Sequence, residues 1–192
     1  FSRNVNSRNQ LKNLSKSIQN NVDNPLFISI DQEGGNVSRL KEDYGFPSFP
    51  SWQEIGKLDD ISETKNLAES LANHLDHCGI NLNYAPVLDF DYGKKTYIGN
   101  AHRALSKNPK KIIEHSSVLI ETLNKKNIFS CVKHFPGQGS GHGDTHQGID
   151  DITDTWSEQE LIPYETMINS GLLDMVMISH VFHRIYDSEL PA

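Results

Sequence analysis

The sequence predicts an α/β fold, a (β/α)8 barrel of the TIM type, of which the 192 residues supply only a part. Helical and strand patterns alternate along the chain, which is typical of a parallel sheet. Every cluster of polar candidate residues follows a predicted strand, as in barrels whose sites lie at the carboxyl ends of the strands. Long loops after the strands, and the absence of G-x-G-x-x-G and Walker A motifs, favour a barrel over an open nucleotide-binding sheet.

Four helices are expected where apolar residues recur at helical spacing, as Leu11, Leu14 and Ile18 do in the first. The later helices also carry start signals, namely capping boxes or an Asn-Pro pair. Pro163 predicts an irregular first turn in the last helix. The expected helices are Ser7–Asn20, Asp60–Cys78 (with Glu63), a helix opening at Asn108-Pro109, and Ser157–Ser170 (with Glu160).

Four short apolar runs predict buried parallel strands. They are Leu26–Ile30, Ile80–Leu88, Ile128–Val132 and Leu173–Ile178. A complete barrel has eight strands and about 250 residues. We therefore expect residues 1–192 to be part of one longer barrel domain, with an unpaired sheet edge when taken alone.

Composition narrows the class of protein. The net charge of -7 argues against nucleic-acid binding, and no apolar run approaches the length of a membrane span. Cys78 and Cys131 fall in a predicted helix end and a predicted strand. Buried free thiols are typical of a reducing compartment, so we expect a cytoplasmic protein. From the charge and the lack of a membrane span we expect no nucleic-acid or membrane partner.

The stretch Lys133–Asp150 carries the densest chemistry, with three histidines and five glycines after a predicted strand. Asp144 lies two residues before His146, a spacing that lets a carboxylate orient one imidazole nitrogen while the other transfers a proton. Asp31 similarly follows the first strand and precedes paired glycines, which fits either a ligand loop or a solvated turn. The density of titratable residues in Lys133–Asp150 predicts a catalytic site.

Four motifs in order resemble the N-terminal (β/α) barrel domain of glycoside hydrolase family 3, in its bacterial β-N-acetylglucosaminidase branch. They are Asp31–Arg39 (DQEGGNVSR), Arg103 in RALSKNP, Lys133–Gly137 (KHFPG) and Asp144–His146 (DTH). The opening FSRNVNSRNQL resembles the segment just after that domain's first strand. The resemblance implies that residues 1–192 lack the first strand and the C-terminal strands that carry the nucleophile.

The resemblance also implies roles for these residues. Asp31, Arg39, Arg103, Lys133 and His134 would hold the N-acetyl sugar. His146 would be the general acid and base, oriented by Asp144, on a loop that moves. The implied reaction is retaining removal of terminal β-linked N-acetylglucosamine from muropeptides or chitooligosaccharides, in cell-wall recycling, with no cofactor and no metal.

Three features depart from the family pattern. Gln138 stands where the family usually has His, which we expect to alter the loop rather than the chemistry. Ala101-His102 look inserted just before Arg103. The family's nucleophilic Asp follows a later strand, and no such motif follows His180, so we expect the nucleophile to lie outside these residues.

Other functions remain open at this point. A non-catalytic sugar-binding protein would keep the sugar-holding residues and lack a nucleophile. A metal-dependent hydrolase would use His142, Asp144 and His146, whose types and spacing suit a metal ion. A phosphorylase is the third possibility, because a histidine acid/base does not repel phosphate as a carboxylate does.

Overall fold

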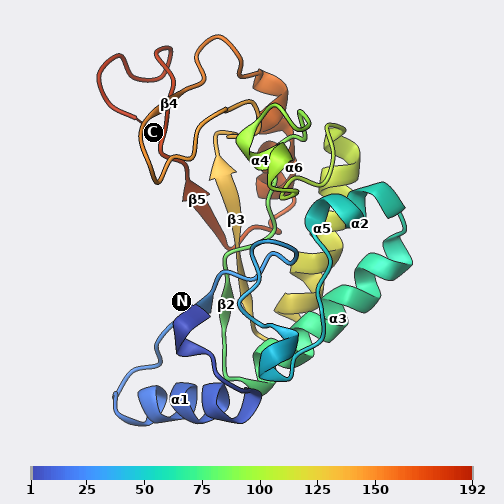
Figure 1. The fold of residues 1–192 in the computed structure, drawn as a ribbon, viewed down its shortest axis with the longest axis vertical. Helices are drawn as coiled ribbons and strands as arrows, with labels where there is room; N and C mark the ends of the chain where they lie inside the picture. Colours follow the sequence, from blue (N-terminus) through green and yellow to red (C-terminus); the bar gives the residue numbers. More distant parts are fainter. Residues whose placement is uncertain (1, 192) are drawn as a thin grey trace.

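A parallel sheet of four strands runs through the computed structural model, which describes residues 2–191 (Figure 1). The strand order is β1-β2-β3-β5, and all three neighbouring pairs are parallel. The strands are β1 (Ser29–Ile30), β2 (Leu82–Asn83), β3 (Phe129–Phe135) and β5 (Met175–Ile178). Phe1 and Ala192, the outermost residues of the expected domain, lie outside the described part.

Residues 2–191 form six α-helices, of which α1 precedes the first strand, and α2, α3 and α5 lie together on one side of the sheet (Figure 1). Asn108 caps α5 and precedes Pro109 in its first turn, as expected, and Ser7 caps α1 by accepting from the N–H of Gln10. The helices are α1 (Arg8–Asn20), α2 (Trp52–Leu58), α3 (Ile61–His77), α4 (Tyr97–Asn100), α5 (Pro109–Asn124) and α6 (Ile162–Asn169). The short 3-10 turns are η1 (Ser2–Asn4), η2 (Glu42–Tyr44) and η3 (Glu158–Leu161).

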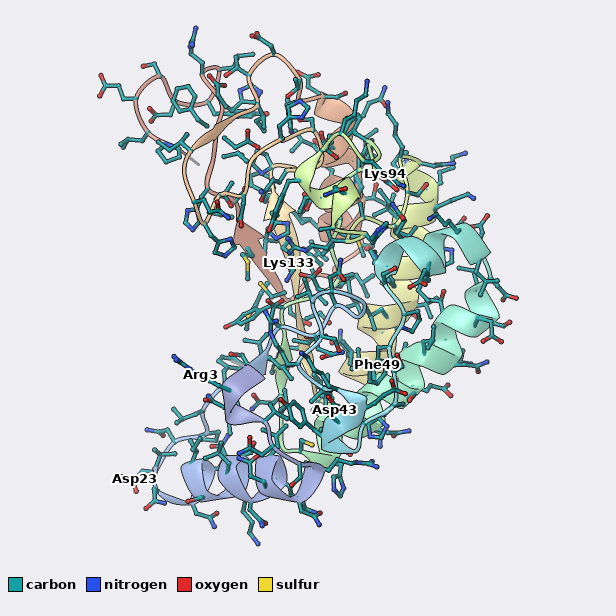
Figure 2. All side chains as sticks on the ribbon, viewed as in Figure 1. Arg3, Asp23, Asp43, Phe49, Lys94 and Lys133 are labelled. Carbon is teal, nitrogen blue, oxygen red and sulfur yellow. The ribbon has the colours of Figure 1, made fainter. Side chains whose placement is uncertain are left out.

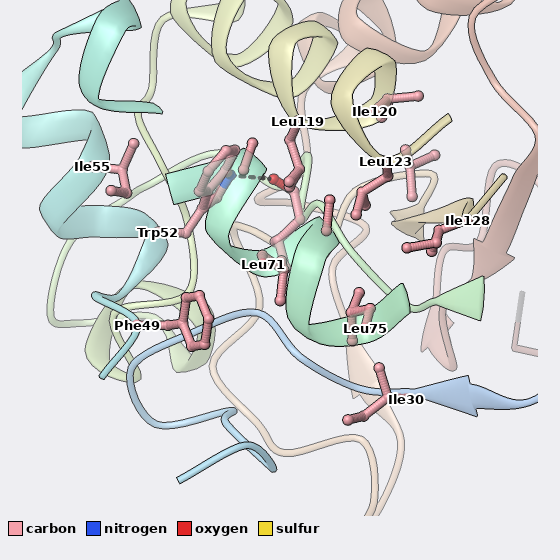
Figure 3. Packing of buried hydrophobic residues seen from close by; sticks show 14 of the residues in the cluster. Ile30, Phe49, Trp52, Ile55, Leu71, Leu75, Leu119, Ile120, Leu123 and Ile128 are labelled. Carbon is pink, nitrogen blue, oxygen red and sulfur yellow. Dashed lines mark hydrogen bonds between the residues drawn. The ribbon is translucent and has the colours of Figure 1, made fainter. Parts of the chain in front are cut away.

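The hydrophobic core lies between these helices and the sheet (Figure 3). Leu75 and Leu123 from the facing helices α3 and α5 are fully buried. Trp52 of α2 packs into the same cluster, and its indole N–H donates to the carbonyl of Val87 at 3.0 Å. Each such side chain contributes roughly 1.5–3 kcal/mol by leaving water, so the core holds the strand ends in place.

The observed strands differ in length from the expected ones. β2 covers only Leu82–Asn83 of the expected Ile80–Leu88, because the chain beyond it leaves the ladder and returns only as a bridge between Val87 and Lys133. β3 instead runs on to Phe135. Lys133 and His134 therefore belong to the strand, whereas the sequence analysis placed them in the loop after it.

Two short helices and two short strands were not predicted. Helices α2 and α4 occupy stretches read as loop or left unassigned, although Ser51 and Glu54 form a complete capping box before α2. Strands β4 (Asp150–Asp151) and β6 (Val181–Phe182) pair in parallel as a small second sheet. Elements of two to seven residues hold too few periodic positions for a pattern to stand out.

The start of the last helix corrects one prediction and confirms another. Ser157 caps the N–H of Gln159, but Glu160 does not complete a capping box, because its side chain is buried under the loop after β3. The irregular first turn expected at Pro163 is present as the 3-10 turn η3 before α6. The parallel sheet with its connecting helices confirms the α/β class.

The expectation of buried free thiols is confirmed. Cys78 and Cys131 are both free and buried. Among residues 2–191, no helix combines the length and apolar character needed to cross a bilayer.

Candidate active site

The carboxyl ends of the parallel strands meet at one edge of the sheet and supply the candidate site. β1 leads directly into Asp31, and β2 leads into Tyr84. β3 carries Lys133 and His134 near its end, and β5 leads into Ser179. Figure 2 shows Lys133 near the middle of the molecule, whereas the labelled residues Asp23 and Lys94 lie at its outside.

A bulge in β3 lets two consecutive side chains serve the same site. Lys133 pairs with Met177 and Phe135 with Ile178, so His134 is an extra residue in the ladder. Neighbouring residues of a regular strand face opposite sides of the sheet, and a bulge redirects a side chain. Lys133 and His134 thus both line one pocket.

A network of paired charges, of which Glu33 and Lys133 are buried, forms the floor of the site. The Lys133 ammonium contacts Asp31 Oδ1 at 2.6 Å and also donates to Glu33. Arg103 grips Glu33 with two parallel bonds, Nε to Oε2 at 2.9 Å and Nη2 to Oε1 at 2.8 Å. Arg39 holds the other oxygen of Asp31 at 3.1 Å. Each buried charge therefore has an opposite partner, which burial requires.

Glu33 is the most strongly stabilised anion of this network. Its side chain is only 2% exposed. Burial alone would raise the pKa of Glu33, but the hydrogen bond from Arg103 and the charges of Lys133 and Arg103 outweigh burial and lower it to about 2. Glu33 consequently stays ionised at neutral pH and fixes both cations.

A buried carboxylate orients His134. The Nδ1 of His134 donates to Asp89, which is fully buried, and Nε2 accepts from Arg103 at 3.1 Å. This pattern places the ring proton on Nδ1. His134 is thus held in one tautomer between an anion and a cation, a rigid arrangement suited to binding.

His146 lies at the rim of the site on the loop after β3. Its Nδ1 bonds to Asp144 Oδ1 at 2.9 Å, and the side chain is 85% exposed. Hydrogen bonds from the backbone and then the side chain of His146 lower the pKa of Asp144. Nε2 has no hydrogen-bond partner among the described residues.

One pocket of about 250 Å³ brings most of the expected residues together. Asp31, Arg103, Lys133, His134 and His146 all line it. Two expected residues act one step away: Arg39 reaches the site through Asp31, and Asp144 through His146. Tyr84, Tyr97, Gln138, Ser179 and His180 line the same pocket.

Two buried carboxyl groups hold the backbone of the loop after β3. The N–H of Gln138 donates to Asp89 at 2.8 Å, and the N–H of Gly139 donates to Glu160 at 3.2 Å. Tyr92 also donates its hydroxyl to Glu160 at 3.2 Å. Burial, and next the charge of Asp89, raise the pKa of Glu160 to about 8. Glu160 is therefore protonated at neutral pH, unlike Glu33.

The structure gives no support to the metal-site hypothesis. His142 Nδ1 donates to the carbonyl of Lys95 at 2.8 Å, and His142 does not line the pocket. Within residues 2–191, no three His, Cys, Asp or Glu side chains are grouped so as to hold a metal ion. Asp144 and His146 are thus left as a pair.

Sequence reasoning missed the three buried carboxyl groups that support the site. Glu33 lies inside the DQEGG motif but was given no role, and Asp89, directly after the second predicted strand, was not expected to hold a histidine or the loop. Glu160 was read as a helix cap. Position at a strand end signals the first two, whereas nothing in the local sequence distinguishes a buried Glu160 from an exposed cap.

A model of the glycosyl hydrolase family 3 N-terminal domain matches residues 1–192. The chain belongs to this family. A β-hexosaminidase from Bordetella avium strain 197N is 33% identical over 198 residues, which cover 98% of this chain and 55% of the relative. The chain therefore spans about half the length of the curated relatives it matches.

Solved structures agree with this family 3 assignment. Native NagZ from Neisseria gonorrhoeae superposes with a TM-score of 0.87 at 32% identity, covering 99% of this chain and 57% of that one. A second structure of that NagZ contains N-trifluoroacetyl-D-glucosamine. The family match and these structures confirm the resemblance and the TIM-barrel type of the fold.

Proposed function

We propose that the full polypeptide carrying residues 1–192 is a retaining β-N-acetylglucosaminidase. The observation that carries the proposal is the placement of the His146–Asp144 pair at the rim of a pocket whose floor is Asp31, Arg103, Lys133 and His134. Relatives named β-hexosaminidase, and a related NagZ structure with an N-acylated glucosamine, support this substrate class.

The floor of the pocket binds the sugar. Asp31 accepts hydrogen bonds from sugar hydroxyls, and the Lys133 ammonium, which has a third proton beyond those given to Asp31 and Glu33, donates one. The network holds these groups before the sugar arrives, so little ordering is needed on binding.

His146 transfers the proton in both steps. In the first, Nε2 protonates the leaving glycosidic oxygen while an aspartate nucleophile attacks the anomeric carbon. In the second, Nε2 removes a proton from the water that releases the sugar. Asp144 keeps a proton on Nδ1 throughout, and it stabilises the imidazolium that is present before the first step and is restored by the second.

The nucleophile in this proposal is an aspartate outside residues 1–192. No aspartate in the described chain both follows a strand and lines the pocket except Asp31, which Lys133 and Arg39 already engage. We further propose terminal N-acetylglucosamine of peptidoglycan fragments as the substrate and the cytoplasm as the location, in keeping with two free buried cysteines.

Hydrolysis of 4-nitrophenyl N-acetyl-β-glucosaminide by the full polypeptide tests the proposal. We expect turnover with release of the β-anomer of N-acetylglucosamine, which NMR detects before mutarotation. Saturable binding of N-acetylglucosamine without turnover would contradict the enzyme and favour a sugar-binding protein. Turnover that requires added phosphate and yields a sugar phosphate would identify a phosphorylase instead.

A further inference from the structure

The side-chain amide of Gln138 has a paired oxygen and an unpaired nitrogen. The side chain lines the pocket, yet the residue is only 3% exposed. Its Oε1 accepts from the Ser179 hydroxyl at 3.1 Å. Its Nε2 has no hydrogen-bond partner among residues 2–191. This nitrogen is not sealed from solvent, and the side chain that carries it lines the pocket.

The position of this amide is closely determined. The backbone N–H of Gln138 is held by Asp89, and the next N–H along the chain is held by Glu160. Ser179 Oγ accepts from the N–H of Val181 at 3.3 Å while it donates to Gln138 Oε1. The amide is therefore fixed at both its backbone and its oxygen, which leaves Nε2 pointing at the cavity.

Gln138 supplies a neutral donor beside the two cations of this pocket. The two pocket cations, Arg103 and Lys133, already give hydrogen bonds to Glu33 and Asp31. A sugar presents many hydroxyl and acetamido oxygens, and a donor left unpaired in a buried pocket costs free energy. An amide, unlike the histidine usual at this position, also keeps its donors at every pH.

We propose that Gln138 is a specificity-determining residue, donating a hydrogen bond from Nε2 to one oxygen of the sugar bound in this pocket. This inference rests on the proposed function, since it takes an N-acetylated sugar as the ligand. It differs from the expectation that replacing His by Gln would alter only the loop.

Binding of N-acetylglucosamine to the full polypeptide, measured by calorimetry, tests the inference. Gln138→Met keeps the length of the side chain and removes the donor, so we expect about three- to tenfold weaker binding. Gln159→Met makes the same change at an exposed position of η3 and should bind as the wild type does. Equal affinity of the Gln138→Met and wild-type proteins would overturn the inference.

Deoxy sugars separate a direct contact from an effect on the loop. The analogues are 3-, 4- and 6-deoxy and N-deacetylated N-acetylglucosamine. The analogue that lacks the oxygen that Nε2 reaches should bind to the wild type as weakly as it binds to Gln138→Met. A uniform loss for every analogue would show that Gln138 acts only by shaping the loop, and would also overturn the inference.

A measurement on the wild-type protein covers the case in which Gln138→Met does not fold. Titration of ¹⁵N-labelled protein with N-acetylglucosamine should shift the Gln138 side-chain amide signal, identified by its loss in Gln138→His. An unshifted signal at saturation would refute the contact. Failure of the wild type to bind N-acetylglucosamine at all would instead refute the proposed function, and this inference with it.

Discussion

Two buried glutamates of the site take opposite charge states because their neighbours differ. Glu33 faces Arg103 and Lys133, and its pKa falls to about 2 despite burial. Glu160 is buried near the negative Asp89, and its pKa rises to about 8. At neutral pH the first is an anion that orders cations, and the second is a neutral acid that supports the loop after β3.

Glu160→Gln should remove part of the pH dependence of stability. In the unfolded chain Glu160 loses its proton near pH 4.5, but in the folded chain only near pH 8. Folding stability from this residue is therefore lost as pH rises through this window, by up to about 1.4 kcal/mol per pH unit. Urea denaturation across the window measures it, with exposed Glu158→Gln as control. An unchanged slope in Glu160→Gln would contradict the assignment.

Glu33→Gln should destabilise the protein by about 3 kcal/mol at neutral pH, because it leaves Arg103 and Lys133 buried with one anion fewer. The contribution of Glu33 is present above pH 4.5 and is lost as pH falls toward 2. Denaturation curves of the mutant and of Glu42→Gln, at an exposed position, provide the comparison. A loss no larger than that of Glu42→Gln would show that the network contributes little.

At the scale of elements, sequence patterns predicted what is long and periodic. The helices α1, α3 and α5 begin within one residue of their predicted starts, because apolar spacing and capping residues act locally. The end of β3 was placed too early, since whether Lys133 pairs with a neighbouring strand depends on β5, far along the chain. Strand length is a property of the pair rather than of one segment.

Some residues of the candidate site could be predicted from the sequence, and others could not. Asp31, Lys133 and His146 stand out because they follow strands in motifs, and the structure brings them to one pocket. Whether they bind and react as expected is still a prediction. Glu160 could not be found, because its partner Gly139 lies 21 residues earlier and only tertiary packing joins them.

Gly139→Ala should displace the loop after β3. A Cβ at Gly139 would lie 2.4 Å from the carbonyl oxygen and 2.7 Å from the nitrogen of Phe90. Both are backbone atoms, which cannot move away as the end of a flexible side chain can. We expect a loss of about 1–3 kcal/mol in thermal denaturation. Gly148→Ala, in the same loop with open space around it, should be near neutral. Equal stability of the two variants would show that the close approach is not needed.

At the scale of the whole molecule, both outer strands of the described sheet have an open edge. β1 and β5 end the strand order, and apolar side chains are exposed beside them, including Phe27 at 58% and Ile178 at 60%. Unpaired edges with exposed apolar residues favour pairing with further strands. This is the arrangement that a longer barrel would complete.

Residues 1–192 expressed alone should therefore self-associate. Light scattering over a range of concentrations should show a rising mass and binding of a hydrophobic dye, whereas the full polypeptide should stay at one mass. The substitution Ile178→Lys places a charge on the open strand β5 and should reduce the association. A fragment that stays monomeric and unfolds cooperatively would contradict the expectation of a partial barrel.

The central claim is that His146 protonates the leaving group, and the dependence of its loss on the leaving group tests this most directly. We would compare full-length wild type, His146→Ala and His142→Ala on 2,4-dinitrophenyl N-acetyl-β-glucosaminide and on N,N′-diacetylchitobiose. His142 is an exposed histidine of the same loop and serves as control. The quantity compared is kcat/KM, which reports the first step and not the later hydrolysis of the glycosyl-enzyme. We predict that His146→Ala lowers kcat/KM about 10²–10⁴-fold on the disaccharide but hardly at all on the dinitrophenyl sugar, whose leaving group needs no proton. Equal loss on both substrates, or no loss on the disaccharide, would contradict the role of His146.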